Sequence, residues 1–188
     1  MEIKYRKATI EDAYGYEFVA AHSWKDTYWD LLPHEYLENR ISRLSNKKEL
    51  EIKINSIKEY LRNNTGKVFV ATDNDKVIGI LSIDENEGKY KEYGHLEAIY
   101  LLPEYKGNKI GKELLMMAMK ELIKLGYNNM QLECMVGNKT IDFYLKYGGY
   151  EIEKTTRNIY GQNVNVSIVL FDNLKEILEK MTSYKKNK

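Results

Sequence analysis

The hydrophobic residues of this chain recur with two different periods, which together predict a mixed α/β fold. Apolar runs of strand length indicate strands, and apolar residues that recur every three or four positions indicate helices. The predicted strands cover residues 3–8, 67–72, 76–83, 93–102, 130–136, 150–156 and 159–170. The predicted helices cover residues 9–20, 33–44, 50–61, 110–125, 138–147 and 174–181.

The order of these elements favours a mixed sheet over a purely parallel one. Strands follow one another in a meander after the N-terminal helices, and only later do strands alternate with helices. We therefore expect a mostly antiparallel sheet of about seven strands with helices on both faces. A length of 188 residues suits a single domain, 1–188, with a full hydrophobic core.

The strand, loop and helix at residues 93–125 form the most informative stretch of the chain. Pro103 ends the apolar strand because it cannot donate a hydrogen bond to a ladder. Helical spacing begins at Ile110, and Gly126 follows its last apolar residue. The connecting loop contains Lys106, Gly107, Asn108, Lys109, Ile110, Gly111 and Lys112. Lysine charges beside the N–H groups of a helix N-terminus predict an anion-binding loop, and an ordinary turn with solvated lysines is the alternative.

This loop resembles the coenzyme A pyrophosphate loop of the GNAT superfamily of N-acetyltransferases, Arg/Gln-x-x-Gly-x-Gly/Ala. Lys106 stands at the Arg/Gln position and Gly111 at the final Gly/Ala position, whereas Lys109 replaces the usual glycine. The resemblance implies that acetyl-CoA is the acetyl donor and that loop 106–112 holds its pyrophosphate. It also implies a splayed central strand pair, in which the pantetheine arm lies along the backbone of Ile99, Tyr100 and Leu101.

Residues 131–150 resemble a second conserved block of the same superfamily, Asn-x-x-x-x-Phe-Tyr-x-x-x-Gly-Gly/Phe. The matching residues are Asn138, Phe143, Tyr144, Gly148 and Gly149, as in the branch whose block ends in Gly-Gly. The resemblance implies that Asn138 contacts the pantetheine arm and that Tyr144 acts as the general acid toward the departing thiolate. Packing of an amphipathic helix is the alternative role for its aromatic residues.

Acetyl transfer to an amine also needs a base, because a lysine-like ammonium has a pKa of about 10.4 and cannot attack a thioester. His95 occupies the superfamily's base position, eleven residues before Lys106. A histidine pKa of about 6.5 suits this role. Glu97 shares the strand face of His95, and Glu133 resembles a base of some members, so the candidates rank His95, Glu97, Glu133. A histidine that only packs within the strand is the alternative for His95.

The aromatic stretch at residues 21–33 resembles the loop that binds substrate in small-molecule members of the superfamily. Trp24 and Tyr28 are therefore candidate contacts for an amine acceptor, and core packing is the alternative. The histidines are too scattered to predict a metal site.

Composition narrows the remaining classes of function. A formal charge of +1 gives no overall attraction for nucleic acid or an anionic membrane, so neither is an expected partner. One cysteine, Cys134, excludes an internal disulfide and favours the cytoplasm, as does the lack of an apolar N-terminal segment. We expect an acetyl-CoA-dependent N-acetyltransferase, with a non-catalytic acyl-CoA-binding regulator of the same fold as the alternative. The sequence leaves open whether the chain is a monomer or a homodimer.

Overall fold

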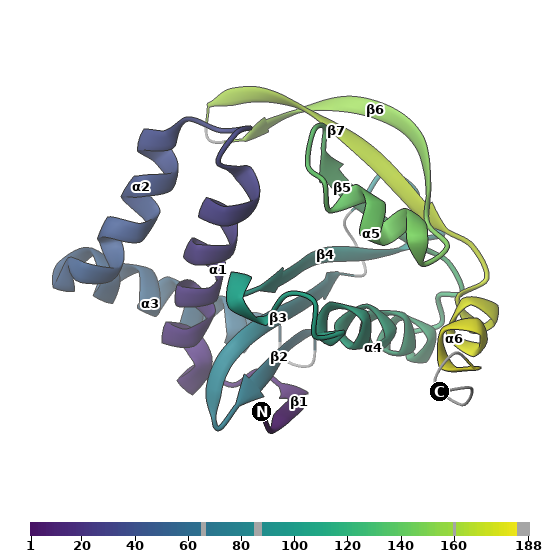
Figure 1. Cartoon of the computed structure of the whole chain (residues 1–188), viewed down its shortest axis with the longest axis horizontal. Helices are drawn as coiled ribbons and strands as arrows, with labels where there is room; N and C mark the ends of the chain where they lie inside the picture. Colours follow the sequence, from purple (N-terminus) through teal and green to yellow (C-terminus); the bar gives the residue numbers. More distant parts are fainter. Residues whose placement is uncertain (65–66, 85–87, 160, 184–188) are drawn as a thin grey trace. The chain divides into compact units, whose positions relative to one another are not determined.

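In the computed structural model of the chain, seven strands form one mixed sheet (Figure 1). The structure describes residues 1–64, 67–84, 88–159 and 161–183. The strand order is β1-β2-β3-β4-β5-β7-β6. The described registers are antiparallel for β1–β2, β2–β3, β5–β7 and β6–β7, and parallel for β4–β5. The predicted mixed, mostly antiparallel sheet is therefore confirmed.

The predicted elements are all present, with some changes at their ends. The strands are β1 (Ile3–Lys7), β2 (Val68–Asp73), β3 (Lys76–Asp84), β4 (Gly94–Leu101), β5 (Met130–Met135), β6 (Tyr150–Ile159) and β7 (Gln162–Phe171). The helices are α1 (Ala13–Tyr28), α2 (His34–Ser42), α3 (Lys47–Asn63), α4 (Ile110–Lys124), α5 (Ile141–Lys146) and α6 (Leu174–Ser183).

The chain divides into two compact units. The first consists of Met1–Ser82 and Ala98–Leu115, and the second consists of Ile83–Glu97 and Met116–Lys188. The boundary between the units therefore passes through β3, β4 and α4.

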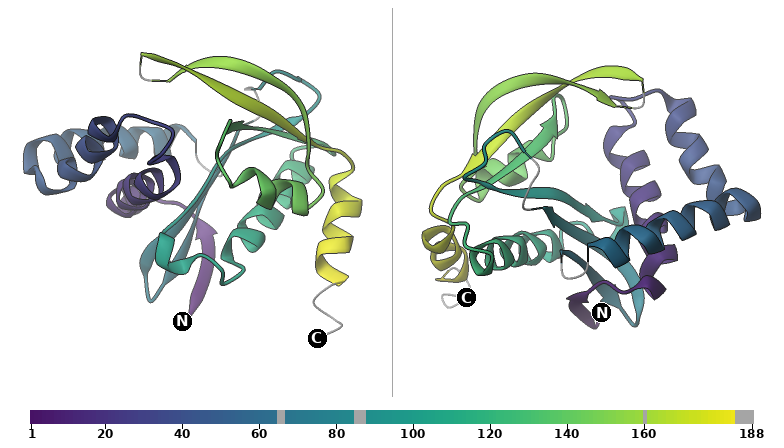
Figure 2. Two further views of the ribbon diagram at one scale, coloured as in Figure 1. Left: turned by 45° about the horizontal axis from the view of Figure 1, so that its top comes forward. Right: turned by 180° about the vertical axis from the view of Figure 1, so that it is seen from behind.

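Three packed helices, α1 to α3, belong wholly to the first unit (Figure 2). The buried carboxylate of Asp12 precedes α1 and accepts the N–H of Thr9 at 2.8 Å. It also accepts two hydrogen bonds from the guanidinium of Arg6, at 2.6 and 2.7 Å. Burial raises the pKa of Asp12, but these hydrogen bonds lower it more, so the net shift is downward. Thr9 thus caps a short 3₁₀ turn, Ile10–Asp12, that leads into α1, and the Arg6 contact ties this turn to β1.

The β2–β3 hairpin is the core of the first unit. Its turn residues Asn74 and Asp75 have φ angles of 47° and 67°, which suit a two-residue turn between twisted strands. Residues 68–72 and 77–83 are buried without interruption. Because neighbouring residues of a strand face opposite sides, both faces of this hairpin are covered.

Two consecutive glycines, Gly148 and Gly149, lie at the junction of α5 and β6 in the second unit. Gly148 has a φ of +97°, a left-handed conformation that ends α5. At Gly149, a Cβ atom would lie 2.7 Å from Cζ of Phe171 and 2.9 Å from Cγ1 of Val169. The first glycine is therefore required by backbone conformation, and the second by close packing on β7.

The central strands β4 and β5 share a short parallel ladder. Among the described residues, they pair at Gly94 with Met130 and at His95 with Gln131. Gly94 and Leu96 are buried, whereas residues 98–101 of the same strand are half-buried. The described ladder between these strands is therefore confined to two residue pairs.

The structure corrects several predicted boundaries. The stretch expected as a substrate loop is largely helix, because α1 continues to Tyr28 with Ala21 and Ser23 buried along it. Helix α5 is shorter than predicted, and Ile159 ends β6 and does not begin β7. Leu125, expected on the buried face of the central helix, is 45% exposed because α4 ends before it. Thr65 and Gly66, which follow the predicted helix 50–61 as a stop signal, and the tail 184–188 lie outside the described residues.

Candidate active site

The predicted anion loop lies between a short 3₁₀ turn, Pro103–Tyr105, and the start of α4. Gly107 and Lys109 both have left-handed backbone conformations, with φ angles of +83° and +63°. A Cβ atom at position 107 would meet no other atom within 4 Å, so the left-handed backbone conformation, and not crowding, requires glycine there. Lys109 has the conformation that glycine adopts most easily, at the position where the superfamily usually has glycine.

The N-terminus of α4 directs backbone N–H groups toward this loop. Its first i to i−4 hydrogen bond joins the N–H of Glu113 to the carbonyl of Lys109 at 3.1 Å. The N–H groups of Ile110, Gly111 and Lys112 precede that bond and lie at the open end of the helix. The side chains of residues 106–109 are exposed, whereas Ile110 is buried and anchors the helix. An exposed, basic loop at a helix N-terminus is suited to holding a diphosphate.

The strand end that precedes the loop is accessible. Ile99, Tyr100 and Leu101 are each half-buried. A Cβ atom at Gly79 would lie only 3.3 Å from the carbonyl oxygen of Tyr100, so glycine permits close approach of β3 to this strand.

The predicted acceptor residues Trp24 and Tyr28 belong to one aromatic cluster in the first unit. Their ring centroids are 5.0 Å apart, and the Trp24 ring also lies 6.3 Å from Tyr100 and 6.2 Å from Tyr36. The buried guanidinium of Arg40 is 4.4 Å from the centre of the Trp24 ring and donates a hydrogen bond to the Tyr36 hydroxyl. Trp24, a residue of α1, thus packs against side chains of α2 and β4.

In the second unit, the three candidate bases share one face of the sheet. His95 pairs with Gln131 in the parallel ladder, so their side chains point to the same side. Glu97 and Glu133 each lie two residues further along the respective strands and therefore face that side too. His95 is half-buried, with its Nδ1 atom out of solvent, whereas Glu97 is exposed.

Glu133 is engaged by Arg157 of β6. The Nε atom of Arg157 lies 3.0 Å from both carboxylate oxygens of Glu133, and a second guanidinium nitrogen lies 2.5 Å from one of them. This hydrogen bond raises the pKa of Arg157. This bidentate contact occupies both carboxylate oxygens of Glu133.

Asn138 and Tyr144 both lie at α5 and are both buried. The side-chain carbonyl of Asn138 accepts the N–H of Thr140 at 2.9 Å and thereby shapes the start of the helix. The Tyr144 ring packs edge-on against Phe143, with centroids 5.2 Å apart. The carbonyl of Tyr144 accepts the N–H of Gly149 at 3.0 Å, which fixes the end of α5.

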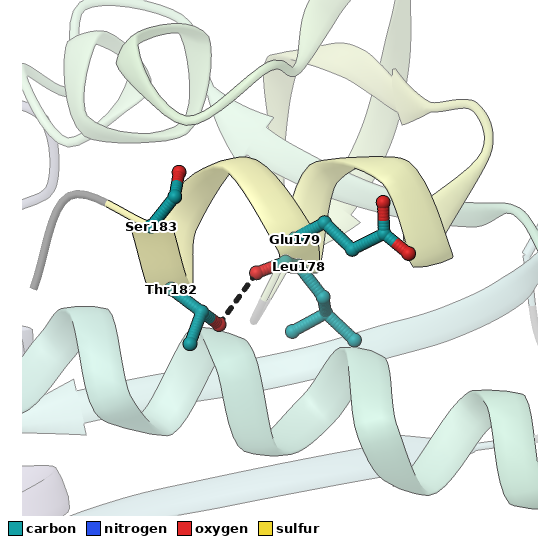
Figure 3. A pocket seen from close by; sticks show the side chains of 4 residues that line it. All are labelled: Leu178, Glu179, Thr182 and Ser183. Atoms are coloured by element: carbon teal, nitrogen blue, oxygen red, sulfur yellow. Dashed lines mark hydrogen bonds between the residues drawn. The ribbon is translucent and has the colours of Figure 1, made fainter. Parts of the chain in front are cut away.

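Other groups in the structure are less suited to catalysis or to ligand binding. Burial raises the pKa of the Cys134 thiol to about 11, so it is protonated near neutral pH. The depression on α6 is lined by Leu178, Glu179, Thr182 and Ser183, and the Thr182 hydroxyl already donates to the Leu178 carbonyl at 2.6 Å (Figure 3).

Within the described residues, no cluster of His, Cys, Asp or Glu could hold a metal ion. None of their helices is both long enough and apolar enough to span a membrane.

Four residues that contact the predicted site residues could not be predicted from the sequence: Asp26, Tyr36, Arg40 and Arg157. Asp26 pairs with Lys106, which is 80 residues away in sequence, and Arg157 pairs with Glu133 across β7. Only the aromatic character of Tyr36 and its helical spacing could have suggested its place in the cluster.

The chain is similar to known acetyltransferases over most of its length. The model of the acetyltransferase (GNAT) family matches residues 21–150. The chain is 33% identical over 156 residues to spermidine N(1)-acetyltransferase of Thermoplasma acidophilum, covering 82% of this chain and 92% of that protein. It is 32% identical over 158 residues to the uncharacterized N-acetyltransferase YuaI of Bacillus subtilis, covering 83% of this chain and 85% of that protein.

A solved structure is similar over nearly the whole chain. PaiA N-acetyltransferase from Thermoplasma acidophilum, crystallised in complex with coenzyme A, superimposes with a TM-score of 0.65 at 29% identity, covering 92% of this chain and 99% of that one. The family match, the relatives and the fold agree: the chain belongs to the acetyltransferase (GNAT) family.

Proposed function

We propose that this chain transfers the acetyl group of acetyl-CoA to a primary amine by direct attack within a ternary complex. The observation that carries the proposal is the basic loop 106–112, whose left-handed residues lead into the open N-terminus of α4. The coenzyme A complex of the similar PaiA structure supports the same donor. Residues 1–188 act as one N-acetyltransferase domain, of the branch with a Gly-Gly second block, in the cytoplasm.

The donor is held along its length by groups from the predicted sites. Lys106, Lys109 and Lys112 bind the diphosphate together with the N–H groups of residues 107–112. The half-buried backbone of Ile99, Tyr100 and Leu101 pairs with the pantetheine arm, and the amide nitrogen of Asn138 donates to it.

In the chemical step, a base takes a proton from the ammonium, and the neutral nitrogen attacks the thioester carbonyl. A C–N bond forms, the C–S bond breaks, and Tyr144 donates its hydroxyl proton to the departing thiolate. The second proton, which the nitrogen loses as it becomes an amide, restores the Tyr144 hydroxyl through solvent. His95 is the leading base, because Arg157 engages Glu133 and Glu97 is exposed to water. Glu97 and Glu133 follow in that order.

A polyamine-type amine is the first acceptor to test, because the spermidine acetyltransferase relative matches over 82% of this chain. Trp24 and Tyr28 supply aromatic surface for the acceptor.

The test is a thiol-release assay with acetyl-CoA across spermidine, other polyamines, amino acids, aminoglycosides and peptide amines, with product mass confirmed. We expect amine-dependent thiol release and a monoacetylated product for at least one class. Tight coenzyme A binding without turnover on any amine would instead support the acyl-CoA-binding regulator. Failure of the chain to bind coenzyme A would overturn both proposals.

A further inference from the structure

One ion pair joins the anion loop to α1 in the first unit. The ammonium of Lys106 contacts the Asp26 carboxylate, although the two residues are 80 positions apart in sequence. The side chains are 48% and 41% exposed, so an arriving ligand can reach both partners. Lys106 is the first lysine of the loop and stands at the Arg/Gln position of the superfamily pattern.

Asp26 lies in the same two helical turns as the predicted acceptor residues. Trp24 and Tyr28 flank it in α1, and the Trp24 ring contacts Tyr100 at the strand end before the loop. The end of α1 and the turn Pro103–Tyr105 also line one surface pocket, formed by His22, Lys25, Asp26, Trp29, Pro103 and Glu104. Asp26, Trp24 and Tyr28 therefore belong to the same end of α1.

A lysine ammonium that binds a carboxylate is less available to a phosphate, because both anions use the same positive charge. We propose that Asp26 competes with the anionic donor for Lys106, so that donor binding breaks this pair and releases the end of α1 that carries Trp24 and Tyr28. The inference rests on the proposed function, in which loop 106–112 binds the diphosphate of coenzyme A. Because coupling is reciprocal, the position of α1 in turn sets the affinity of the loop for the donor.

Removing the competitor strengthens donor binding. In Asp26→Asn, the affinity for coenzyme A measured by calorimetry should rise about 2- to 5-fold at low ionic strength, the size expected when an exposed ion pair no longer has to be broken. The gain should shrink as salt screens the charges. Glu104→Gln is the matched control, because Glu104 is an exposed acid that lines the same pocket.

A double-mutant cycle separates competition from simple repulsion between Asp26 and the donor's phosphates. Competition requires Lys106, so Asp26→Asn should have no effect on affinity in a Lys106→Gln background. Repulsion does not require Lys106, and the gain would persist in that background. An equal gain in Glu104→Gln would likewise overturn the proposal.

Tryptophan fluorescence reports on the release of α1. The chain has 2 tryptophans, Trp24 and Trp29, and they flank Asp26 at the end of α1. Coenzyme A should change the emission of the parent protein, and the free Asp26→Asn variant should already resemble the bound parent. If free parent and free variant emit alike and respond alike to coenzyme A, the pair does not control α1.

These outcomes are distinguishable from failure of the proposed function. If coenzyme A binds and Lys106→Gln weakens it, but Asp26→Asn changes neither affinity nor emission, only the competition is wrong. If coenzyme A does not bind, or binds equally well after the lysines of the loop are replaced, the donor site itself is wrong.

Discussion

Lys109 combines two opposing effects that one substitution can separate. Its φ of +63° lies in the left-handed region, which costs a residue with a Cβ atom about 1–2 kcal/mol. Glycine removes that cost, but the greater conformational entropy of glycine in the unfolded chain destabilises the folded state by about 0.5–1 kcal/mol. Lys109→Gly should therefore stabilise the protein by about 0.5–1 kcal/mol, which corresponds to a rise in Tm of roughly 1–4 °C for a chain of this size.

The same substitution should weaken donor binding. It removes one of the loop's lysines, and an exposed charge of this kind contributes about 0.2–1 kcal/mol, so the affinity for coenzyme A should fall by at most about 5-fold. Thermal unfolding of the free protein and calorimetry with coenzyme A measure the two effects independently.

Two control variants assign each effect to its cause. Lys109→Asn removes the charge but tolerates the left-handed conformation, so it should match Lys109→Gly in affinity and retain part of its stabilisation. Lys109→Arg keeps both the charge and the strain and should match the parent in both assays. A Tm for Lys109→Gly at or below that of the parent would refute the role assigned to the backbone.

Three further predictions concern Asp12, His95 and Tyr144. Asp12→Asn should lose about 1–3 kcal/mol of unfolding free energy at neutral pH, because it breaks the charged hydrogen bonds with Arg6. The pKa of folded Asp12 is lowered, so this stabilisation is complete above about pH 4 and disappears as pH falls through the folded value; denaturation across pH measures it. His95→Ala should lower kcat/KM by roughly 10²-fold. It should also abolish the acidic limb of the pH profile of kcat/KM, which is expected near a histidine pKa. Tyr144→Phe should lower kcat with little change in acetyl-CoA affinity, and this loss should shrink at high pH, where a thiolate needs less help.

Each of these predictions has an outcome that contradicts it. A stability difference between Asp12→Asn and its parent that persisted at low pH would point to packing and not to charge. An acidic limb that survives in His95→Ala but vanishes in Glu97→Gln or Glu133→Gln would move the base to that residue. Equal rates for Tyr144→Phe and the parent across neutral pH would remove Tyr144 from the mechanism.

Local patterns in the sequence predicted the elements of the fold because those elements depend on nearby residues. The β2–β3 turn follows from Asn74 and Asp75, which adopt positive φ angles easily. Gly126 ends α4 by a left-handed turn, with its N–H bonded to the carbonyl of Ile123.

The sequence could not predict the partners that come from distant segments. No local pattern joins Asp26 to Lys106 or Arg157 to Glu133, because these contacts depend on how α1 and the loop, or β5 and β6, are placed in the folded chain. The aromatic stretch was equally ambiguous, since Trp24 and Tyr28 suit a loop or a helix face, and burial of Ala21 and Ser23 in α1 decides for the helix.

The most direct test of the donor site uses a pair of variants at Gly111, in the first turn of α4. Gly111→Glu adds negative charge where the diphosphate is proposed to bind, and Gly111→Ala adds a methyl group without charge. Calorimetry with coenzyme A should show affinity lost in Gly111→Glu and largely retained in Gly111→Ala, with both variants folded by circular dichroism. Undiminished affinity in Gly111→Glu would contradict the assignment of loop 106–112 as the donor site.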